Sequence, residues 1–273
     1  MRQVLDLSSL RVLRGSSVRS ILLKASGLVL LLLAVAAGVG RIAKNRSETR
    51  FHDFPRVTLW AWERPEDLRA LDPKRYAIAY LDQTISISDR AWSTPRFQPL
   101  QVASSARLIA VIRIEAPTQT AQVDVSGLTI VVADLIASSA KKPGVAALEV
   151  DFDAARSQRQ FYSEVLHEVR RLMPEDMPLS ITALASWCGR GDWLKDLPVD
   201  EAVPMLFRMG LDPHASNRPG WTYPIREPLC STSVGVSTDE TWPSILPTQR
   251  IYVFHPRPWD ALAVANVRKL IGP

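Results

Sequence analysis

Residues 147–155, with the sequence ALEVDFDAA, alternate apolar and acidic side chains, and this alternation decides the fold. Side chains two positions apart on a β-strand point to the same face. Glu149, Asp151 and Asp153 therefore share one face, and the opposite face carries Leu148, Val150 and Phe152. A segment with helical periodicity follows at once, so we expect the apolar face to meet that helix. The three acids are then predicted to face the interior of a closed sheet, near its rim.

Seven further runs are similar to this strand in length and apolar character. Near-continuous apolar runs of this length are typical of parallel strands that are covered on both faces. Together they give eight predicted strands, at 57–62, 76–82, 108–115, 145–151, 179–187, 202–207, 231–237 and 250–255.

Helices are predicted between some of these strands. The segment 157–173 has apolar residues at helical spacing, and Ser157 with Gln160 matches a capping box at its start. Pro65, which two acids follow, predicts the start of a helix in RPEDLRAL. Further helices are predicted at 126–142 and 259–271.

Strands that alternate with helices predict a trimmed (β/α)8 barrel, a TIM-like α/β fold, over residues 56–273. The barrel is trimmed because residues 83–107 and 211–229 lack helical periodicity. An open doubly wound sheet is the alternative, although no glycine-rich phosphate loop follows the first strand.

The first 55 residues differ in composition from the rest of the chain. Residues 1–20 are basic, residues 21–40 are mostly apolar, and residues 41–55 form a basic, polar linker. An apolar run of about 20 residues is long enough to span a bilayer. Positive charge before it favours a cytoplasmic N-terminus, which places the barrel on the periplasmic or extracytoplasmic side of the inner membrane. A cleaved signal peptide is the alternative, because Ala34-Val35-Ala36 is like a cleavage site.

The net charge of +5 at pH 7 comes largely from basic residues that flank the apolar run. No basic stripe interleaved with aromatic residues occurs elsewhere, so we expect no nucleic-acid partner. The histidines and cysteines match no metal-binding spacing, and we expect neither a metal nor a cofactor. Cys188 and Cys230 suit an oxidising compartment. The sequence leaves open whether they pair, because one follows a predicted strand and the other precedes one.

Polar residues gather where the predicted strands end. In a parallel barrel these carboxyl ends meet at one rim, and active sites of this fold lie there. The predicted ligand-binding residues are Trp62, Glu63, Asp82, Arg113, Glu115, Trp187, Arg208, Asp239, Glu240 and His255. Structural ion pairs at strand ends would give the same pattern.

The three acids of 147–155 are about 7 Å apart along the strand and repel one another when ionised. Such crowding separates pKa values and can keep one acid protonated near neutral pH. An acid that donates a proton to a glycosidic oxygen needs this property.

The pattern Glu-x-Asp-x-Asp at 149–153 resembles the D-x-D-x-E signature of chitinase-type glycoside hydrolases, which are (β/α)8 barrels. The resemblance implies that Asp153 takes the position of the proton donor. It places Asp151 at the middle acid and Glu149 at the first. This chain departs from the signature at the donor, because an aspartate is about one methylene shorter than the glutamate found there.

A second resemblance covers most of residues 57–260. The segments that carry it are WAWERPEDLR, LEVDFDA, LSITALASWC, VDEAVPMLFRMG and GVSTDE. They are similar to a bacterial domain family of unknown function, thought to be a barrel related to glycoside hydrolases. This resemblance implies the barrel fold and no particular reaction.

Two hypotheses for function follow. The first is a membrane-anchored barrel that binds a glycan or another polar small molecule and hydrolyses it, with Asp153 as proton donor and Asp151 and Glu149 tuning its pKa. The candidates for a second carboxylate are Glu63, Asp82, Asp239 and Glu240. The second hypothesis is a non-catalytic barrel that binds carbohydrate or serves as the scaffold of an envelope complex.

Overall fold

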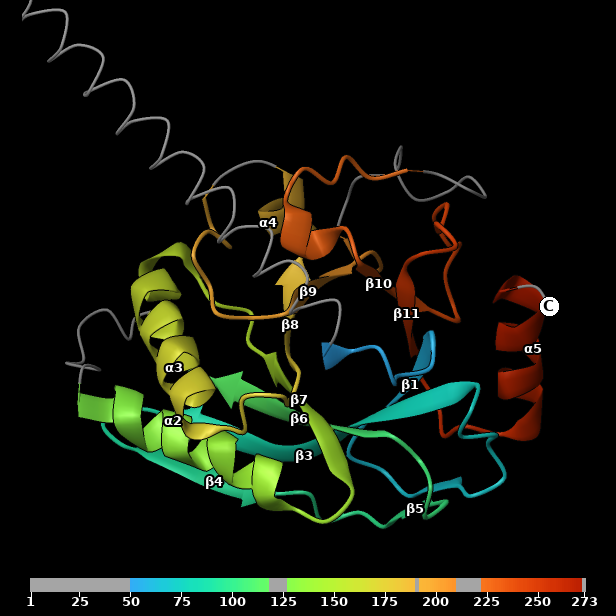
Figure 1. The fold of residues 1–273 in the computed structure, drawn as a ribbon, viewed down its shortest axis with the longest axis horizontal. Coiled ribbons are helices and arrows are strands. Elements are labelled where there is room, and N and C mark those ends of the chain that lie inside the picture. Colours follow the sequence, from blue (N-terminus) through green and yellow to red (C-terminus); the bar gives the residue numbers. More distant parts are fainter. Residues whose placement is uncertain (1–49, 118–126, 190–191, 210–221, 272–273) are drawn as a thin grey trace, which may run out of the picture. The chain divides into compact units, whose positions relative to one another are not determined.

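Eight parallel strands close into a barrel in the computed structural model (Figure 1). The strands are β1 (Val57–Ala61), β3 (Tyr76–Ile87), β6 (Leu108–Glu115), β7 (Val145–Asp151), β8 (Leu179–Leu184), β9 (Glu201–Met205), β10 (Ser233–Ser237) and β11 (Arg250–Phe254). Pairing of β1 with both β3 and β11 closes the sheet. The predicted (β/α)8 barrel is confirmed, and the alternative of an open doubly wound sheet is wrong.

The structure describes residues 50–117, 127–189, 192–209 and 222–271, all within the unit Ser47–Pro273. The segments predicted as a basic N-terminus (1–20) and a membrane anchor (21–40) lie outside these residues, as does most of the linker. In the part that is described, no helix combines the length and apolar character needed to cross a membrane.

Three short strands accompany the barrel. β4 (Ala91–Pro95) pairs antiparallel with a long extension of β3, and β2 (Glu66–Leu68) pairs in parallel with β5 (Leu100–Val102). The helix predicted in RPEDLRAL is wrong, because β2 occupies part of this segment. Glu66 is buried, where it accepts hydrogen bonds from Arg64 and from the amide of Trp259, and these contacts outweigh local helix signals.

The helical elements are α2 (Leu128–Ser138), η3 (Ser139–Lys141), η4 (Arg156–Gln158), α3 (Arg159–Leu172), α4 (Ala185–Gly189), η5 (Pro228–Cys230) and α5 (Ala261–Ile271). The predicted helices at 126–142, 157–173 and 259–271 are confirmed in place. The predicted capping box is wrong. Gln158, not Gln160, accepts a hydrogen bond from the amide of Ala155, because the helix is preceded by the 3-10 turn η4.

Apolar residues form one cluster outside the barrel and another inside it. Leu148 and Val150 belong to the outer cluster, and the ring of Phe152 lies 5.3 Å from that of Tyr162 on α3. Helices α2 and α3 pack side by side over this part of the barrel (Figure 1). The apolar face of 147–155 therefore covers a helix, as its alternation predicts.

Among the described residues, the segments that follow β8 and β9 contain the short helical elements α4 and η5. The predicted strand at 179–187 ends at Leu184, and α4 begins at Ala185. Cys188 on α4 forms a disulfide with Cys230 on η5, with Cα atoms 5.8 Å apart. Both cysteines are fully buried. The two cysteines therefore pair, which answers the question that the sequence leaves open.

The N-terminal end of the barrel is closed by the segment that precedes β1. Phe51 is buried in the inner cluster, with its ring 4.4 Å from the Arg250 guanidinium carbon. Arg50 forms an ion pair of 2.6 Å with Asp200, which also pairs with Arg170 at 2.8 Å. Asp200 and Arg250 stand at the starts of β9 and β11, so these contacts all lie at one end.

Candidate functional site

A cavity of about 400 Å³ opens at the C-terminal end of the barrel. Six of the residues predicted to form the site line it: Trp62, Arg113, Asp151, Asp153, Arg208 and His255. They come from the ends of β1, β6, β7, β9 and β11, which the closed sheet brings together. The cavity lies where this fold usually carries its active site.

Asp151 ends β7 with both carboxylate oxygens engaged. One oxygen accepts a hydrogen bond of 2.9 Å from Arg113, and the other accepts one of 2.8 Å from Thr182. Burial raises the pKa of Asp151, whereas Arg113 and the Thr182 hydroxyl oppose this rise. Asp151 is therefore an anchored acid that fixes the guanidinium of Arg113 at the cavity wall.

Asp153 lies two residues further on, beyond the end of β7, and is exposed. Its side chain makes no hydrogen bond to any other residue in the described parts of the chain, and its charge acts on Arg113 and Asp151. Of the two acids that line the cavity, Asp153 is thus the one whose oxygens are available to a ligand.

Glu149 lies deeper, inside the barrel, with no exposed surface. Neither of its carboxylate oxygens has a hydrogen-bond partner of normal geometry among the described residues. Burial raises the pKa of Glu149 well above its usual value, and the charges of Glu201 and Asp151 add to this shift, while the Ser180 hydroxyl opposes it. Burial and the neighbouring acids therefore favour the protonated form of the Glu149 carboxyl group.

Glu201 is the second fully buried glutamate inside the barrel, and it is fully paired. It accepts a hydrogen bond of 2.6 Å from the hydroxyl of Tyr252 and one of 2.5 Å from Arg250. The barrel interior thus holds one paired and one unpaired glutamate below the cavity.

His255 follows β11 and lies mostly buried at the cavity wall. Its Nδ1 atom is 2.5 Å from the hydroxyl of Thr238, and its ring lies 4.9 Å from that of Trp259. Burial lowers the pKa of His255, and the positive charges of Arg64 and Arg257 lower it further. The imidazole is therefore neutral at pH 7.

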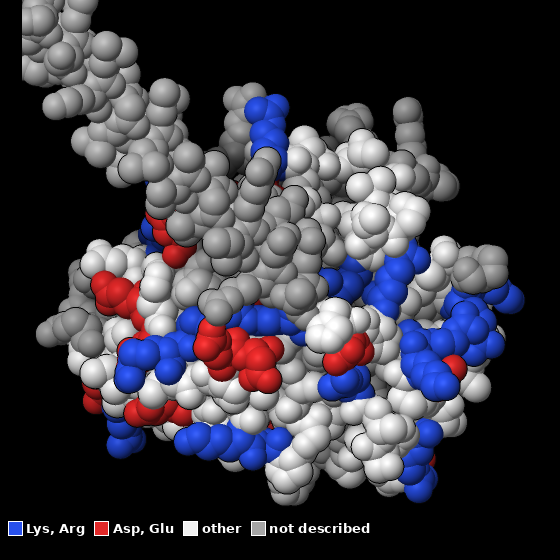
Figure 2. Space-filling view, in the orientation of Figure 1, with Lys and Arg blue, Asp and Glu red and all other residues white. Residues whose placement is uncertain are grey.

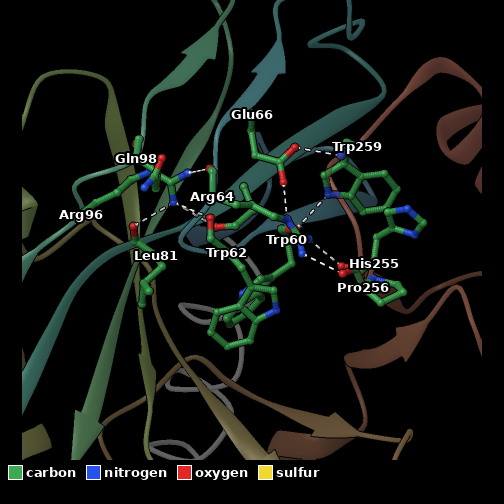
Figure 3. Close-up of polar contacts among 11 residues, drawn as sticks. Trp60, Trp62, Arg64, Glu66, Leu81, Arg96, Gln98, His255, Pro256 and Trp259 are labelled. Carbon is green, nitrogen blue, oxygen red and sulfur yellow. Dashed lines mark hydrogen bonds and ion pairs between the residues drawn. The ribbon is translucent and has the colours of Figure 1, made fainter.

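Two arginines fix the rim around His255 and Trp62 (Figure 3). Arg64 donates hydrogen bonds to the carbonyl oxygens of His255 (2.6 Å) and Pro256 (3.0 Å), and it pairs with Glu66. Arg96 donates to the carbonyl oxygens of Trp62 (2.7 Å) and Arg64 (2.5 Å). Arg64 and Glu66 of the segment WAWERPEDL thus hold neighbouring segments in place.

The acids of the cavity lie in a stretch of the chain that is similar to a known domain family. Residues 105–204 match the family described as Domain of unknown function (DUF3142). The resemblance to a domain family of unknown function is thereby confirmed over these residues, which include Arg113, Asp151 and Asp153. No curated protein matches the chain.

Among solved structures, the chain is similar to the crystal structure of the chitinase domain of the spore coat protein CotE from Clostridium difficile. The identity is 13% and the TM-score is 0.40. The similarity covers 72% of this chain and 64% of that domain, which is somewhat less than two thirds of its length.

Four predicted site residues do not line the cavity and instead hold neighbouring segments. Glu63 accepts hydrogen bonds from the amides of Phe97 and Gln98. Asp82 sits at a bulge in β3, where it binds Ser139 and Lys142 on the outer face. Trp187 belongs to the outer cluster and stacks on Trp193 with ring centroids 3.7 Å apart. Glu115 is exposed and pairs with Arg113 at 3.2 Å.

The last two predicted residues, Asp239 and Glu240, do not line the cavity and instead contact Arg208, which does. Asp239 accepts a hydrogen bond from Ser237, which lowers its pKa, and lies 3.4 Å from Arg208. Glu240 accepts hydrogen bonds of 3.1 Å from the amide of Arg208. These contacts hold Arg208 in a left-handed backbone conformation with φ of 51°.

Sequence reasoning missed the apolar wall of the cavity, which consists of Leu184, Met205, Phe207 and Phe254. It also missed Arg64 and Ser237. Strand alternation could have found Met205 and Phe207, because they are two residues apart and share a face. The residues that the structure describes contain no group of three histidine, cysteine or acidic side chains that could hold a metal ion.

Proposed function

We propose that the barrel binds a glycan in the cavity at its C-terminal end and hydrolyses it, with Asp153 as the proton donor. The observation that carries this proposal is the contrast between two acids on one cavity wall. Asp151 is fixed by Arg113 and Thr182, whereas the oxygens of Asp153 accept no hydrogen bond from any residue that the structure describes. Trp62, Phe207 and Phe254 supply aromatic faces on which the apolar face of a sugar ring can pack.

The placement of the acids limits which mechanisms of glycoside hydrolysis are possible. Among the described residues that line the cavity, the two carboxylates both come from β7 and the loop after it. A mechanism with two protein carboxylates needs one on each side of the scissile bond. We therefore propose a substrate-assisted route, in which a group on the sugar takes the place of the second carboxylate. A 2-acetamido sugar carries such a group.

The test is hydrolysis by the full chain in detergent, measured as release of reducing ends from oligomers of N-acetylglucosamine and of glucose. Cleavage of the acetamido sugar alone, with a loss of about 100-fold or more in Asp153→Asn, is the expected result. Asp89→Asn is the matched control, because Asp89 is an exposed aspartate on a hairpin away from the cavity. Full activity in Asp153→Asn would remove Asp153 from this role.

A non-catalytic glycan-binding barrel is the second candidate. The short side chain of Asp153 and the one-sided placement of the acids favour it. In calorimetry, binding of an oligosaccharide that is never cleaved would support this candidate. Absence of any binding would favour a scaffold for an envelope protein partner.

We also propose that the barrel works outside the cytoplasm, attached to the inner membrane by residues 21–40. The buried disulfide between Cys188 and Cys230 supports an oxidising compartment. Digestion of the barrel by protease added to intact spheroplasts is the expected result. Protection until the cells are lysed would contradict it.

A further inference from the structure

A second cavity, of about 460 Å³, adjoins the first at the C-terminal end of the barrel. The two cavities share Trp62 and Arg113 as lining residues. On its far side the second cavity is bounded by the loop that carries Phe97 and Gln98. The two cavities are therefore neighbours at the rim, with Trp62 and Arg113 in the wall of both.

Phe97 is unusual in this loop because 89% of its surface is exposed. No other large apolar side chain in the described part of the chain is as exposed. Leaving such a ring in water forgoes the free energy that burial would provide. An exposed aromatic ring beside a cavity is the kind of surface on which a ligand packs.

The backbone beneath Phe97 is firmly held. Glu63 accepts hydrogen bonds of 3.0 Å from the amide of Phe97 and 2.7 Å from the amide of Gln98. Arg96 donates to the carbonyl oxygens of Gln98 (2.8 Å) and Trp62 (2.7 Å), which ties the loop to the end of β1 (Figure 3). The ring of Phe97 is therefore presented by a preorganised loop, which limits the entropy lost on binding.

We infer that Phe97 forms a second sugar-binding subsite, so that the ligand is an extended glycan chain spanning both cavities. This inference rests on the proposed function. Glu63 acts as a positioning residue, since both of its hydrogen bonds go to the loop. The charged residues that line the second cavity are one arginine, Arg113, and two acids, Glu63 and Glu115, so the lining disfavours an anionic ligand and suits an uncharged sugar.

Ligands of different length can distinguish binding in the first cavity alone from binding across both cavities. The affinities of the full chain and of Phe97→Ala are measured by calorimetry with the dimer and the hexamer of N-acetylglucosamine. We expect the wild-type chain to bind the hexamer more tightly. Phe97→Ala is expected to weaken hexamer binding by about three- to tenfold and to leave dimer binding unchanged. Phe97→Tyr keeps an aromatic face and is expected to restore hexamer affinity.

Trp92→Ala is the matched control. Trp92 is also an exposed aromatic residue, at 45%, but it lies on β4 and lines neither cavity. Equal affinity of the wild-type chain for dimer and hexamer, or equal losses for both in Phe97→Ala, would overturn the subsite while leaving the proposed function standing. A change of oligomeric state in Phe97→Ala would assign the ring to a contact between copies instead. If the wild-type chain binds neither oligomer, the proposed function fails and the subsite with it.

Discussion

Asp200 at the N-terminal end of the barrel and Asp153 at the C-terminal end are both aspartates whose charges act on an arginine, but their surroundings differ. Asp200 is buried, and it pairs with Arg50 and Arg170 and accepts a hydrogen bond from a backbone amide. Asp153 is exposed and has no hydrogen bond to the described residues. The charge of Asp200 holds the chain together at one end of the barrel, whereas the charge of Asp153 stays available at the other.

The same division runs through the barrel interior. Glu201, toward the closed end, is paired with Tyr252 and Arg250. Glu149, nearer the cavity, is buried with no partner of normal geometry among the residues described. Burial of an unpaired acid is costly, and such costs concentrate at functional sites. On the face drawn in Figure 2, basic and acidic side chains are interspersed.

Asp200→Ala is expected to have the largest effect on stability. It removes the carboxylate that accepts hydrogen bonds from Arg50, Arg170 and the amide of Leu179, so both guanidinium groups lose the charge that balances them. Breaking a buried charge network of this kind costs about 3–5 kcal/mol of unfolding free energy. Urea denaturation of the full chain measures the loss. A loss below about 1 kcal/mol would show that the closed end does not stabilise the barrel.

Glu201→Gln comes next, with an expected loss of about 3 kcal/mol. The amide oxygen still accepts from Tyr252, but the charge that balances Arg250 is gone. Removing this charge also removes one cause of the raised pKa of Glu149. The same denaturation series tests the loss, and an unchanged midpoint would contradict it.

Glu149→Gln is expected to raise the free energy of unfolding, in contrast to the two variants above. The pKa of Glu149 in the folded chain lies above its usual value of 4.5, so above pH 4.5 the unfolded chain releases a proton that the folded chain keeps. Stability is therefore lost as the pH rises from 4.5 toward the folded pKa. Glutamine does not titrate, so the variant is expected to gain about 1–3 kcal/mol at pH 7 and little at pH 4.

Unfolding curves of wild-type and Glu149→Gln chains at both pH values measure this difference. A gain of equal size at pH 4 and pH 7 would contradict a protonated Glu149. The double variant with Glu201→Gln sharpens the comparison. The gain from Glu149→Gln is expected to shrink in it, because the neighbouring charge has been removed.

The barrel and its acidic strand could be predicted from local sequence, because burial and alternation are local signals. Residues 108–115 and 145–151 have the predicted bounds as β6 and β7. What failed depended on contacts between distant residues. Glu66 accepts a hydrogen bond from the amide of Trp259, which lies 193 positions away. This contact favours a strand over the helix predicted in RPEDLRAL. Asp82 is an exception, because it is in phase with Ile78 and Tyr80 of the outer cluster and alternation along β3 already places it on the outer face.

In the candidate site, too, contacts between distant residues could not be predicted from local sequence. Alternation places Asp151 and Asp153 at the rim, but it cannot tell that Asp151 is tied to Arg113 while Asp153 is not. Glu63 has the residue type and position of a ligand-binding acid. Its oxygen is instead used by the amides of Phe97 and Gln98, which the chain brings back from 34 and 35 positions away. Which of these acids has oxygens available to a ligand depends on contacts that form only when the barrel closes.

Asp153→Asn is expected to have the smallest effect on stability, within about 0.5 kcal/mol, because the side chain is exposed and its oxygens have no hydrogen-bond partner in the described residues. The same substitution is expected to abolish most hydrolysis, so stability and activity separate at this residue. Asp200→Ala lowers stability through contacts that lie at the opposite end from the cavity. Urea denaturation measured beside turnover for both variants therefore tests whether the two ends are independent. A destabilised Asp153→Asn would show that Asp153 holds the rim together, and the free acid of the cavity would then be a structural one.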